Sequence, residues 1–351
     1  MRTLVFLPLL IAAAAAPAQG YKAVKRWTAG CDNTRHCTAV GFAPEDAEGM
    51  AMLHFERGPG GNDAVQRITL RVDHPVSREN YWILQADDAE LLQFSDAHLV
   101  SSDSGEGNDV VITDADEIAA MFGAMRGADT LTLVGDGGPV GTFSLSGASA
   151  ILLWIDEQQQ RLGTTTAFVR KGDKPASSVP AAPAAERVTA VAGGTAVDEV
   201  EAARLGKLVR ETLEADMCES AADDERLSDA AWELPDGRTL VQLTCYAGAY
   251  NYGSSWFWLA QGAQPQMIAF PVPAEDGSGN MTVTGDLVNA SFDPATGLLD
   301  MFSKGRGIGD CGSRGIWAFD GQHFALVEYA LMSDCQGVTP DYWPLLWRTA
   351  R

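Results

Sequence analysis

The segment from Lys304 to Gly315 combines cationic side chains with closely spaced glycines. Lys304, Arg306 and Arg314 fall within eleven positions, and five glycines lie between positions 305 and 315. Glycine permits backbone conformations in which successive N–H groups converge on an anion. Arginine adds charge-assisted hydrogen bonds to a carboxylate or phosphate group. The segment therefore predicts a binding site for a small anionic ligand.

The same segment also fits a purely structural role. Asp310 lies inside it, and Asp300 and Asp334 lie nearby in the sequence. Any of these carboxylates would pair with Arg306 or Arg314, and the glycines would then serve a tight turn. The residues alone leave both alternatives open.

A second stretch, from Cys245 to Trp258, places three tyrosines and two tryptophans among small residues. Aromatic side chains with polar ends, beside an amide such as that of Asn251, are typical of a sugar or peptide cleft. The core of a β-sheet would show the same composition. The candidate ligand-binding residues of the two stretches are Lys304, Arg306, Asp310, Arg314, Asn251 and Tyr252.

The chain lacks the signatures of common enzyme classes. It contains no G-x-S-x-G, no H-E-x-x-H and no S-x-x-K pattern, and no P-loop. The acidic segment Asp103–Asp109 matches a calcium loop only in part, so it is interpreted as a solvated loop. The sequence therefore predicts no metal site and no cofactor. A glycosidase needs only two carboxyl groups, and among 47 acidic residues such a pair arises by chance.

The charge of the chain limits its partners. The formal net charge is −22, from 25 basic and 47 acidic residues. Phosphate backbones and anionic lipids repel such a chain, which argues against nucleic acid as a partner. The expected partners are a cationic protein of the cell envelope or an anionic small ligand.

The first 18 residues have the composition of a cleavable signal peptide. Arg2 precedes an apolar run from Leu4 to Ala16, and Ala16-Pro17-Ala18 fits the small-x-small cleavage rule. The run is too short to span a bilayer, and no other long apolar segment follows. The sequence predicts a periplasmic protein without a transmembrane segment after cleavage.

Six cysteines follow the predicted cleavage site, an even number that is typical of disulfides in exported proteins. Zinc is disfavoured because no C-x-x-C pattern occurs. Pairing between sequence neighbours is the simplest of the many possible connectivities. It predicts the bonds Cys31–Cys37, Cys218–Cys245 and Cys311–Cys335.

Hydrophobic periodicity predicts a mainly β (α+β) fold with two β-rich domains, of antiparallel sandwich or barrel type. In the first domain, residues 19–172, alternating runs flank Gly58–Asn62 as in a hairpin. Helical spacing follows a capping box at Thr113–Asp116, and a second helix follows Ser146 as its cap. Residues 173–195 are rich in Ala and Pro and predict a linker. In the second domain, residues 196–351, a helix over 197–215 precedes a series of hairpins that suits a meander or barrel, and the helix is expected to plug or flank it.

Five motifs resemble those of a known family. They are Trp27–Asn33 with Cys37, Leu153–Gln158 with Arg161–Thr164, Gly248–Asn251, Lys304–Gly312 and Trp343–Arg348. The chain is similar to exported Gram-negative proteins known as domain of unknown function 1176. Its opening also resembles, more weakly, the invasion-associated locus B proteins, which are periplasmic β-rich domains. The resemblance implies a compartment and a length, but no activity and no catalytic residue.

These observations together predict a periplasmic binding or interaction protein of the cell envelope rather than an enzyme. The alternative is a hydrolase of cell-wall material or glycans that uses a pair of carboxylates.

The predicted cleavage site gives a direct test. We expect the mature chain to begin at Gln19, because Ala18 completes the small-x-small site. N-terminal sequencing of the protein from a periplasmic fraction checks this. An intact Met1 on protein recovered from the cytosol would contradict it.

Overall fold

The structure is a computed structural model. It describes residues 20–73, 76, 81–101, 108–213, 218, 228–274 and 276–350. The predicted signal peptide and Gln19 lie outside them. Within these ranges, no helix is both long and apolar enough to cross a membrane.

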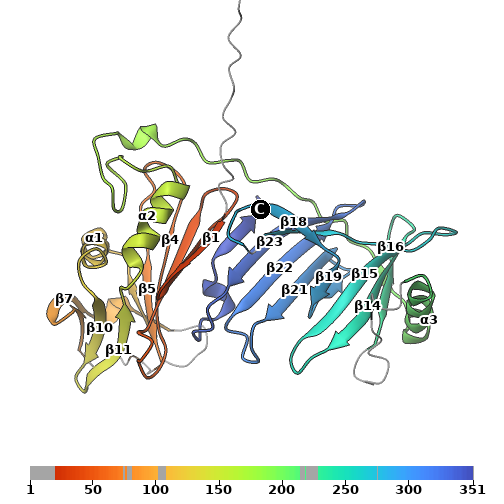
Figure 1. Ribbon diagram of the computed structural model, residues 1–351, viewed down its shortest axis with the longest axis horizontal. Coiled ribbons are helices and arrows are strands. Elements are labelled where there is room, and N and C mark those ends of the chain that lie inside the picture. Colours follow the sequence, from red (N-terminus) through yellow and green to blue (C-terminus); the bar gives the residue numbers. More distant parts are fainter. Residues whose placement is uncertain are drawn as a thin grey trace, which may run out of the picture.

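The N-terminal half, residues 20–172, contains two antiparallel sheets (Figure 1). The first has the strand order β1 (Gly20–Val24), β2 (Trp27–Cys31), β3 (Cys37–Phe42), β4 (Ala51–Arg57), β5 (Ile68–Val72), β9 (Asn108–Ile112), β8 (Leu99–Ser101). The second has the order β11 (Gly138–Ser144), β10 (Thr130–Gly135), β6 (Trp82–Ala86), β7 (Ala89–Phe94). The predicted hairpin of β4 and β5 is present, with Leu53 opposite Leu70.

Two helices cover this half, and both begin one residue later than the sequence predicted. In α1 (Ala115–Ala124) the cap is Asp114 rather than Thr113, because the Asp114 carboxylate accepts the N–H groups of residues 116 and 117. In α2 (Ala148–Gln158) the cap position is Gly147, at φ 105°, so the predicted cap Ser146 is wrong. Only glycine adopts this left-handed conformation readily. Both helices bury their apolar faces in one core with the two sheets.

The C-terminal half, residues 196–350, also consists of antiparallel sheets. One contains β12 (Thr195–Ala196), β13 (Ala230–Glu233), β14 (Thr239–Ala247), β15 (Tyr252–Leu259) and β16 (Gln266–Met267), with β19 (Asp286–Val288) beside β15. Another contains β20 (Ser291–Asp293), β21 (Leu298–Lys304), β22 (Gly312–Phe319), β23 (Phe324–Met332) and β24 (Leu345–Arg348). The strands β17 (Phe270–Pro273) and β18 (Met281–Thr284) form a separate hairpin.

These sheets enclose an aromatic core and do not close into a barrel in the described residues. Trp256 of β15 stacks on Trp232, while Phe270 meets both Trp256 and Trp317 of β22. The mainly β fold is thus confirmed, and the barrel alternative is wrong. The aromatic stretch around Trp256 supplies core side chains, as in the alternative interpretation of that segment.

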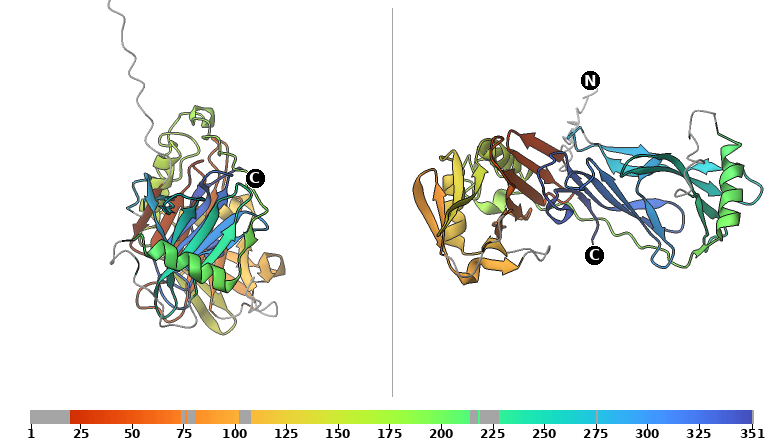
Figure 2. Two further views of the ribbon diagram at one scale, coloured as in Figure 1. Left: turned by 90° about the vertical axis from the view of Figure 1, so that its right-hand side faces the viewer. Right: turned by 90° about the horizontal axis from the view of Figure 1, so that it is seen from below.

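The predicted helix of this half is shorter than expected. It is α3 (Glu199–Arg210), capped by Asp198, whose carboxylate accepts the N–H of Glu201 at 2.9 Å. Its apolar side packs on β13 and β14, and it flanks the sheet at the far end of the molecule (Figure 2). Val209 of α3 is fully buried there.

The two halves are packed against each other through a cluster of apolar side chains. Val40 and Phe42 of β3 and Met52 of β4 meet Met332, Val338 and Trp343. Gly30 of β2 faces the start of β24 so closely that an added Cβ would lie 2.7 Å from Pro344. The division into two independently folding domains stays a prediction.

The predicted linker is an extended segment that is hydrogen-bonded to the rest of the protein. Residues 173–195 run along the molecule from the N-terminal half towards α3 (Figure 1). Val191 donates its N–H to the Phe319 carbonyl at 2.7 Å, and the Glu186 carbonyl accepts from Ala350 at 2.8 Å. Backbone hydrogen bonds therefore fix this Ala/Pro-rich segment at several points along its length.

The disulfides join the neighbouring cysteines that the sequence predicted. They are Cys31–Cys37, Cys218–Cys245 and Cys311–Cys335. The last of these joins the residue just before β22 to the segment after β23, at the edge of the contact between the halves.

The close approach at Gly30 predicts a specific sensitivity to substitution. We expect Gly30→Ala to destabilise the protein by ~1–3 kcal/mol, because the new methyl group overlaps Pro344 and Leu346. Gly123→Ala is the matched control, since nothing lies within 4 Å of its added Cβ. In a helix that change is neutral or stabilises by up to ~1 kcal/mol. Urea denaturation measures the stability of both variants. Equal stabilities would contradict the close packing of Gly30 against Pro344 and Leu346.

Candidate functional site

Two cavities lie on either side of the loop 58–66, which connects β4 to β5. The first, the polar cleft, has a volume of about 440 Å³. Its lining residues are His36, His54, Glu56, Gly58, Ala64, Gln66, Arg67, Thr69, Asp341 and Tyr342. The second, the apolar groove, has a volume of about 400 Å³ and lies between the same loop, α1 and residues 166–171. Ala64 borders both cavities.

A buried arginine, Arg161, holds this loop in place. Arg161 is fully buried, and its guanidinium group donates to the carbonyls of Gly58 at 3.2 Å, Gly61 at 2.9 Å and Gly60. Its Nε donates to Gln159 Oε1 at 3.0 Å. The Gln159 amide in turn donates to the Gly58 carbonyl at 3.1 Å. The loop carbonyls thus lose water but keep hydrogen-bond partners.

A buried ion pair adjoins this arginine. Arg57 Nη1 lies 3.2 Å from Asp156 Oδ1, and both side chains are buried. The Asp156 carboxylate also accepts the N–H groups of Phe168 at 2.9 Å and Val169 at 3.0 Å. Burial, together with the nearby Arg161 charge, lowers the pKa of Arg57 to about 10. Arg57 is therefore still cationic at neutral pH and compensates Asp156.

The polar cleft contains an imidazole that stays neutral. The His54 ring packs edge-on against Tyr342, with centroids 4.9 Å apart, and its Nε2 lies 3.9 Å from Glu56 Oε1. Burial, followed by the nearby charges of Arg67 and Arg71, lowers the pKa of His54 to about 3. Within the described ranges, its Nε2 atom is buried without a hydrogen-bond partner.

A second imidazole stands at the opposite side of Glu56. His36 Nε2 lies 3.6 Å from Glu56 Oε2, and His36 Nδ1 accepts a hydrogen bond from Arg348 at 3.0 Å. Burial and then the Arg348 charge lower the pKa of His36. Arg348 also pairs with the buried Asp32, and its backbone N–H donates to Asn33 at 2.9 Å. The C-terminal strand is therefore fixed to the loop that carries His36.

Tyr342 brings the C-terminal half into the cleft. Its hydroxyl accepts from Arg71 at 3.1 Å, and Arg71 forms a bidentate pair with Asp109 at 2.8 and 2.7 Å. Asp341 lines the cleft beside it. The cleft thus spans the contact between the halves, and its walls are held by ion pairs on both sides.

The chemistry available in the cleft is hydrogen bonding rather than proton transfer by histidine. A general base works best when its pKa lies near the operating pH, and a pKa of about 3 makes His54 a weak base. Glu56 and Asp341 supply carboxylates, and Arg67 supplies a cation at the exposed rim. Across the parts of the chain described, no cluster of three or more His, Cys, Asp or Glu is placed to hold a metal ion. Most of the segment Asp103–Asp109 lies outside those parts.

The three predicted ligand-binding cations lie outside the polar cleft. Arg306 and Arg314 have carboxylate partners, whereas the Lys304 ammonium group lies 5.8 Å from the centroid of the Phe302 ring. Arg306 forms a bidentate pair with Asp310, with Nε to Oδ1 at 2.7 Å, and Asp310 also accepts the Gly337 N–H at 2.6 Å. Arg314 pairs with Glu328 at 2.7 Å, a partner that the sequence did not suggest. These are the contacts of the structural alternative, although the Arg306 side chain is 48% exposed. A ligand-binding role for these residues stays a prediction.

Asn251 contacts the glycine-rich segment, and neither Asn251 nor Tyr252 lines the polar cleft. The Asn251 amide donates to the Lys304 carbonyl at 2.8 Å and accepts the Lys304 N–H at 3.2 Å. Asn289 connects to both residues: it donates to Asn251 Oδ1 at 2.9 Å and accepts the Tyr252 N–H at 2.8 Å. Asn251 therefore joins the turn between β14 and β15 to the end of β21.

The cleft residues were not predicted from the sequence, because the residues that meet in the cleft lie far apart along the chain. The one local signal is the spacing of His54 and Glu56, which alternation places on the same face of β4. Nothing local connects this pair to Tyr342, which lies almost 300 positions later. The motifs that carry the family resemblance instead meet one another: Asp32 and Asn33 contact Arg348, and Asn251 contacts Lys304.

The fold and the cleft define a class of β-rich protein whose two halves share a polar cleft. The chain belongs to the family described as "Protein of unknown function (DUF1176)", which matches residues 21–350. It is 33% identical over 342 residues to the uncharacterized protein YpfG of Escherichia coli (strain K12), covering 95% of this chain and 94% of that protein. No solved structure matches the chain significantly.

The depressed pKa of His54 predicts acid sensitivity. The unfolded chain binds a proton to this ring near pH 6.5, whereas the folded ring binds it only near pH 3. Stability is therefore lost as the pH falls from about 6.5, by up to about 1.4 kcal/mol per pH unit. His54→Phe keeps the aromatic contact with Tyr342 and removes this loss.

Urea denaturation at pH 7.5, 6.0 and 5.0 compares the variant with the wild type. His323→Phe is the matched control, because the His323 side chain is 76% exposed, and it should keep the wild-type slope. Equal pH slopes for wild type and His54→Phe would contradict a buried neutral imidazole.

Proposed function

We propose that this protein is a periplasmic binding protein of the cell envelope whose polar cleft holds a small ligand with hydroxyl and carboxylate groups. Soluble fragments of cell-wall glycan and peptide have this chemistry. The observation that carries the proposal is the cleft itself, about 440 Å³ in volume and lined by polar side chains from both halves. Binding sites for small molecules commonly have ~300–1,000 Å³ and lie between structural units.

Export is supported by two independent features. The apolar run that ends at Ala18 has the pattern of a cleavable signal. Every cysteine is in a disulfide, and such bonds persist in oxidising compartments such as the periplasm.

The side chains of the cleft favour a polar, partly anionic ligand. Arg67 is exposed at the rim, and its Nε donates to Thr69 at 3.3 Å, which orients the guanidinium group. A carboxylate of the ligand would pair with this group. Gln66 lines the cleft and adds an amide for hydroxyl groups.

Calorimetric titration with purified soluble muropeptides tests the proposal. We expect Arg67→Ala to weaken binding about 10- to 100-fold, because a hydrogen bond to a charged group contributes ~1.5–3 kcal/mol. Arg170→Ala is the matched control, since Arg170 is exposed and lines neither cavity. The proposal fails if the wild type shows no saturable binding, or if Arg67→Ala binds as tightly as the wild type.

A second candidate function is hydrolysis of cell-wall glycan. Glu56 and Asp341 line the same cleft, from opposite halves of the chain, and glycosidases use two carboxyl groups ~5–10 Å apart. Incubation with purified sacculi should then release reducing ends, and Glu56→Gln and Asp341→Asn should each abolish the release. Binding of muropeptides by a wild type that releases nothing would leave the binding function alone.

A further inference from the structure

The apolar groove has a floor of hydrophobic side chains that retain contact with solvent. Val65, Ile118, Phe122 and Phe168 keep 6%, 7%, 7% and 9% of their surface exposed, and all four line the groove. Ala119 of α1 is exposed beside them. These side chains form an apolar floor below loop 58–66, while Asn62 and Asp63 of that loop add polar groups to the lining.

Cations stand at the rim of this surface. Arg126, just after α1, and Lys171 both line the groove and are exposed. Within the described residues, neither forms an ion pair with a carboxylate. Arg57 also borders the groove, but its charge is compensated by Asp156. The chain has a net charge of −22, so two neighbouring cations without a carboxylate partner, placed beside an apolar floor, distinguish this groove.

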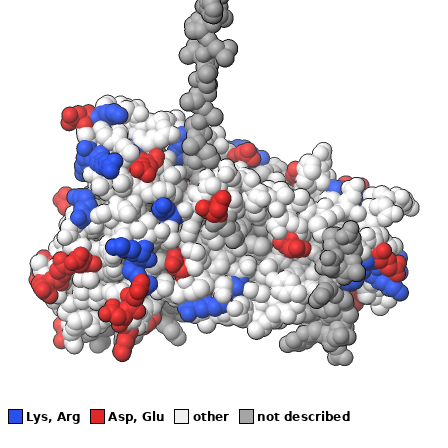
Figure 3. Space-filling model, viewed as in Figure 1, with Lys and Arg blue, Asp and Glu red and all other residues white. Residues whose placement is uncertain are grey.

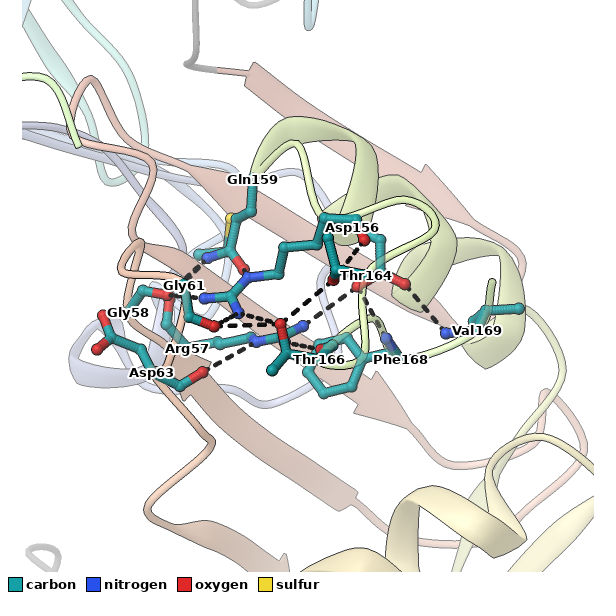
Figure 4. Close-up of polar contacts among 12 residues, drawn as sticks. Arg57, Gly58, Gly61, Asp63, Asp156, Gln159, Thr164, Thr166, Phe168 and Val169 are labelled. Atoms are coloured by element: carbon teal, nitrogen blue, oxygen red, sulfur yellow. Dashed lines mark hydrogen bonds and ion pairs between the residues drawn. The ribbon is translucent and has the colours of Figure 1, made fainter. Parts of the chain in front are cut away.

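The groove is held open before any ligand arrives. Phe168 lies under the Arg57 guanidinium, 3.9 Å from the cation to the ring centroid, and its N–H is held by Asp156 (Figure 4). The Phe168 carbonyl also accepts from Arg126 Nη1 at 3.3 Å. A wall fixed in this way lowers the ordering cost of binding.

We propose that the apolar groove binds a free medium-chain fatty acid, with the alkyl chain on Phe122 and Phe168 and the carboxylate between Arg126 and Lys171. The size agrees: at ~30 Å³ for each water-sized group, a cavity of about 400 Å³ holds on the order of a dozen methylene groups. The charge agrees because an anionic head group would meet two cations that have no carboxylate partner among the described residues. This site is separate from the polar cleft and does not depend on the function proposed for it.

Calorimetric titration of the full mature chain with decanoate, below its micelle concentration, tests the proposal. We expect saturable binding that tightens about fourfold per methylene from hexanoate to decanoate. We also expect 1-decanol to bind at least tenfold more weakly than decanoate. Absence of saturable decanoate binding, equal affinity for 1-decanol, or binding only to phosphatidylglycerol vesicles would overturn the proposal.

Two sets of variants place the ligand in the groove. Ala119→Trp fills the groove and should abolish decanoate binding, whereas Ala203→Trp, at an exposed position of α3, should leave it unchanged. The double change Arg126→Ala and Lys171→Ala should weaken binding at least tenfold. The double change Arg170→Ala and Lys174→Ala alters the net charge equally outside the groove and should have no effect.

The result for Arg67→Ala separates the two sites. This variant should bind decanoate like the wild type, because Arg67 lines only the polar cleft. Unchanged decanoate binding in Ala119→Trp, or equal losses in both double variants, would overturn the assignment to the groove.

Discussion

Two buried guanidinium groups and one buried carboxylate position the loop 58–66, and both cavities depend on that loop. Arg161 supplies donors to its carbonyls, while Arg57 and Asp156 compensate each other next to it. Loss of one partner from such a buried pair typically costs ~3–5 kcal/mol, because an uncompensated charge remains. The loop has glycines that offer no side chains of their own for packing. Its shape is therefore imposed by the polar side chains of residues 156–161 that lie beneath it.

The second constraint is the contact between the halves. Apolar packing around Trp343 holds them together, and polar contacts from Arg348 and Tyr342 then decide which residues of the N-terminal half face the C-terminal strand. The polar cleft exists only because this contact is made. Two of the motifs that carry the family resemblance, Trp27–Asn33 and Trp343–Arg348, meet across this contact, so they help to explain how the halves assemble.

In an acidic chain, cations without a carboxylate partner are the most informative charged groups for locating an anionic ligand. Figure 3 shows charged side chains of both signs gathered over the N-terminal half, with fewer over the sheets of the C-terminal half. The sequence predicted Arg306 and Arg314 as ligand-binding residues, but both have carboxylate partners in the structure. Arg67 at the cleft, and Arg126 and Lys171 at the groove, had no distinguishing sequence context.

The sequence by itself determined the features that depend on near neighbours. Hairpins such as that of β4 and β5, the helix positions to within a few residues and the pairing of adjacent cysteines follow from short-range periodicity and turn chemistry. The cap of α2 was predicted one residue too early, because no side chain caps this helix and the sequence does not show the left-handed backbone conformation of Gly147. Only the tertiary structure decided which side chains face a cavity. His54 contacts Tyr342, and Arg161 contacts Gly58, although the two residues of each pair lie far apart in the sequence. The free energy of such contacts comes from packing and hydrogen bonding between segments that lie far apart in the sequence, and these contacts leave no periodic trace in it.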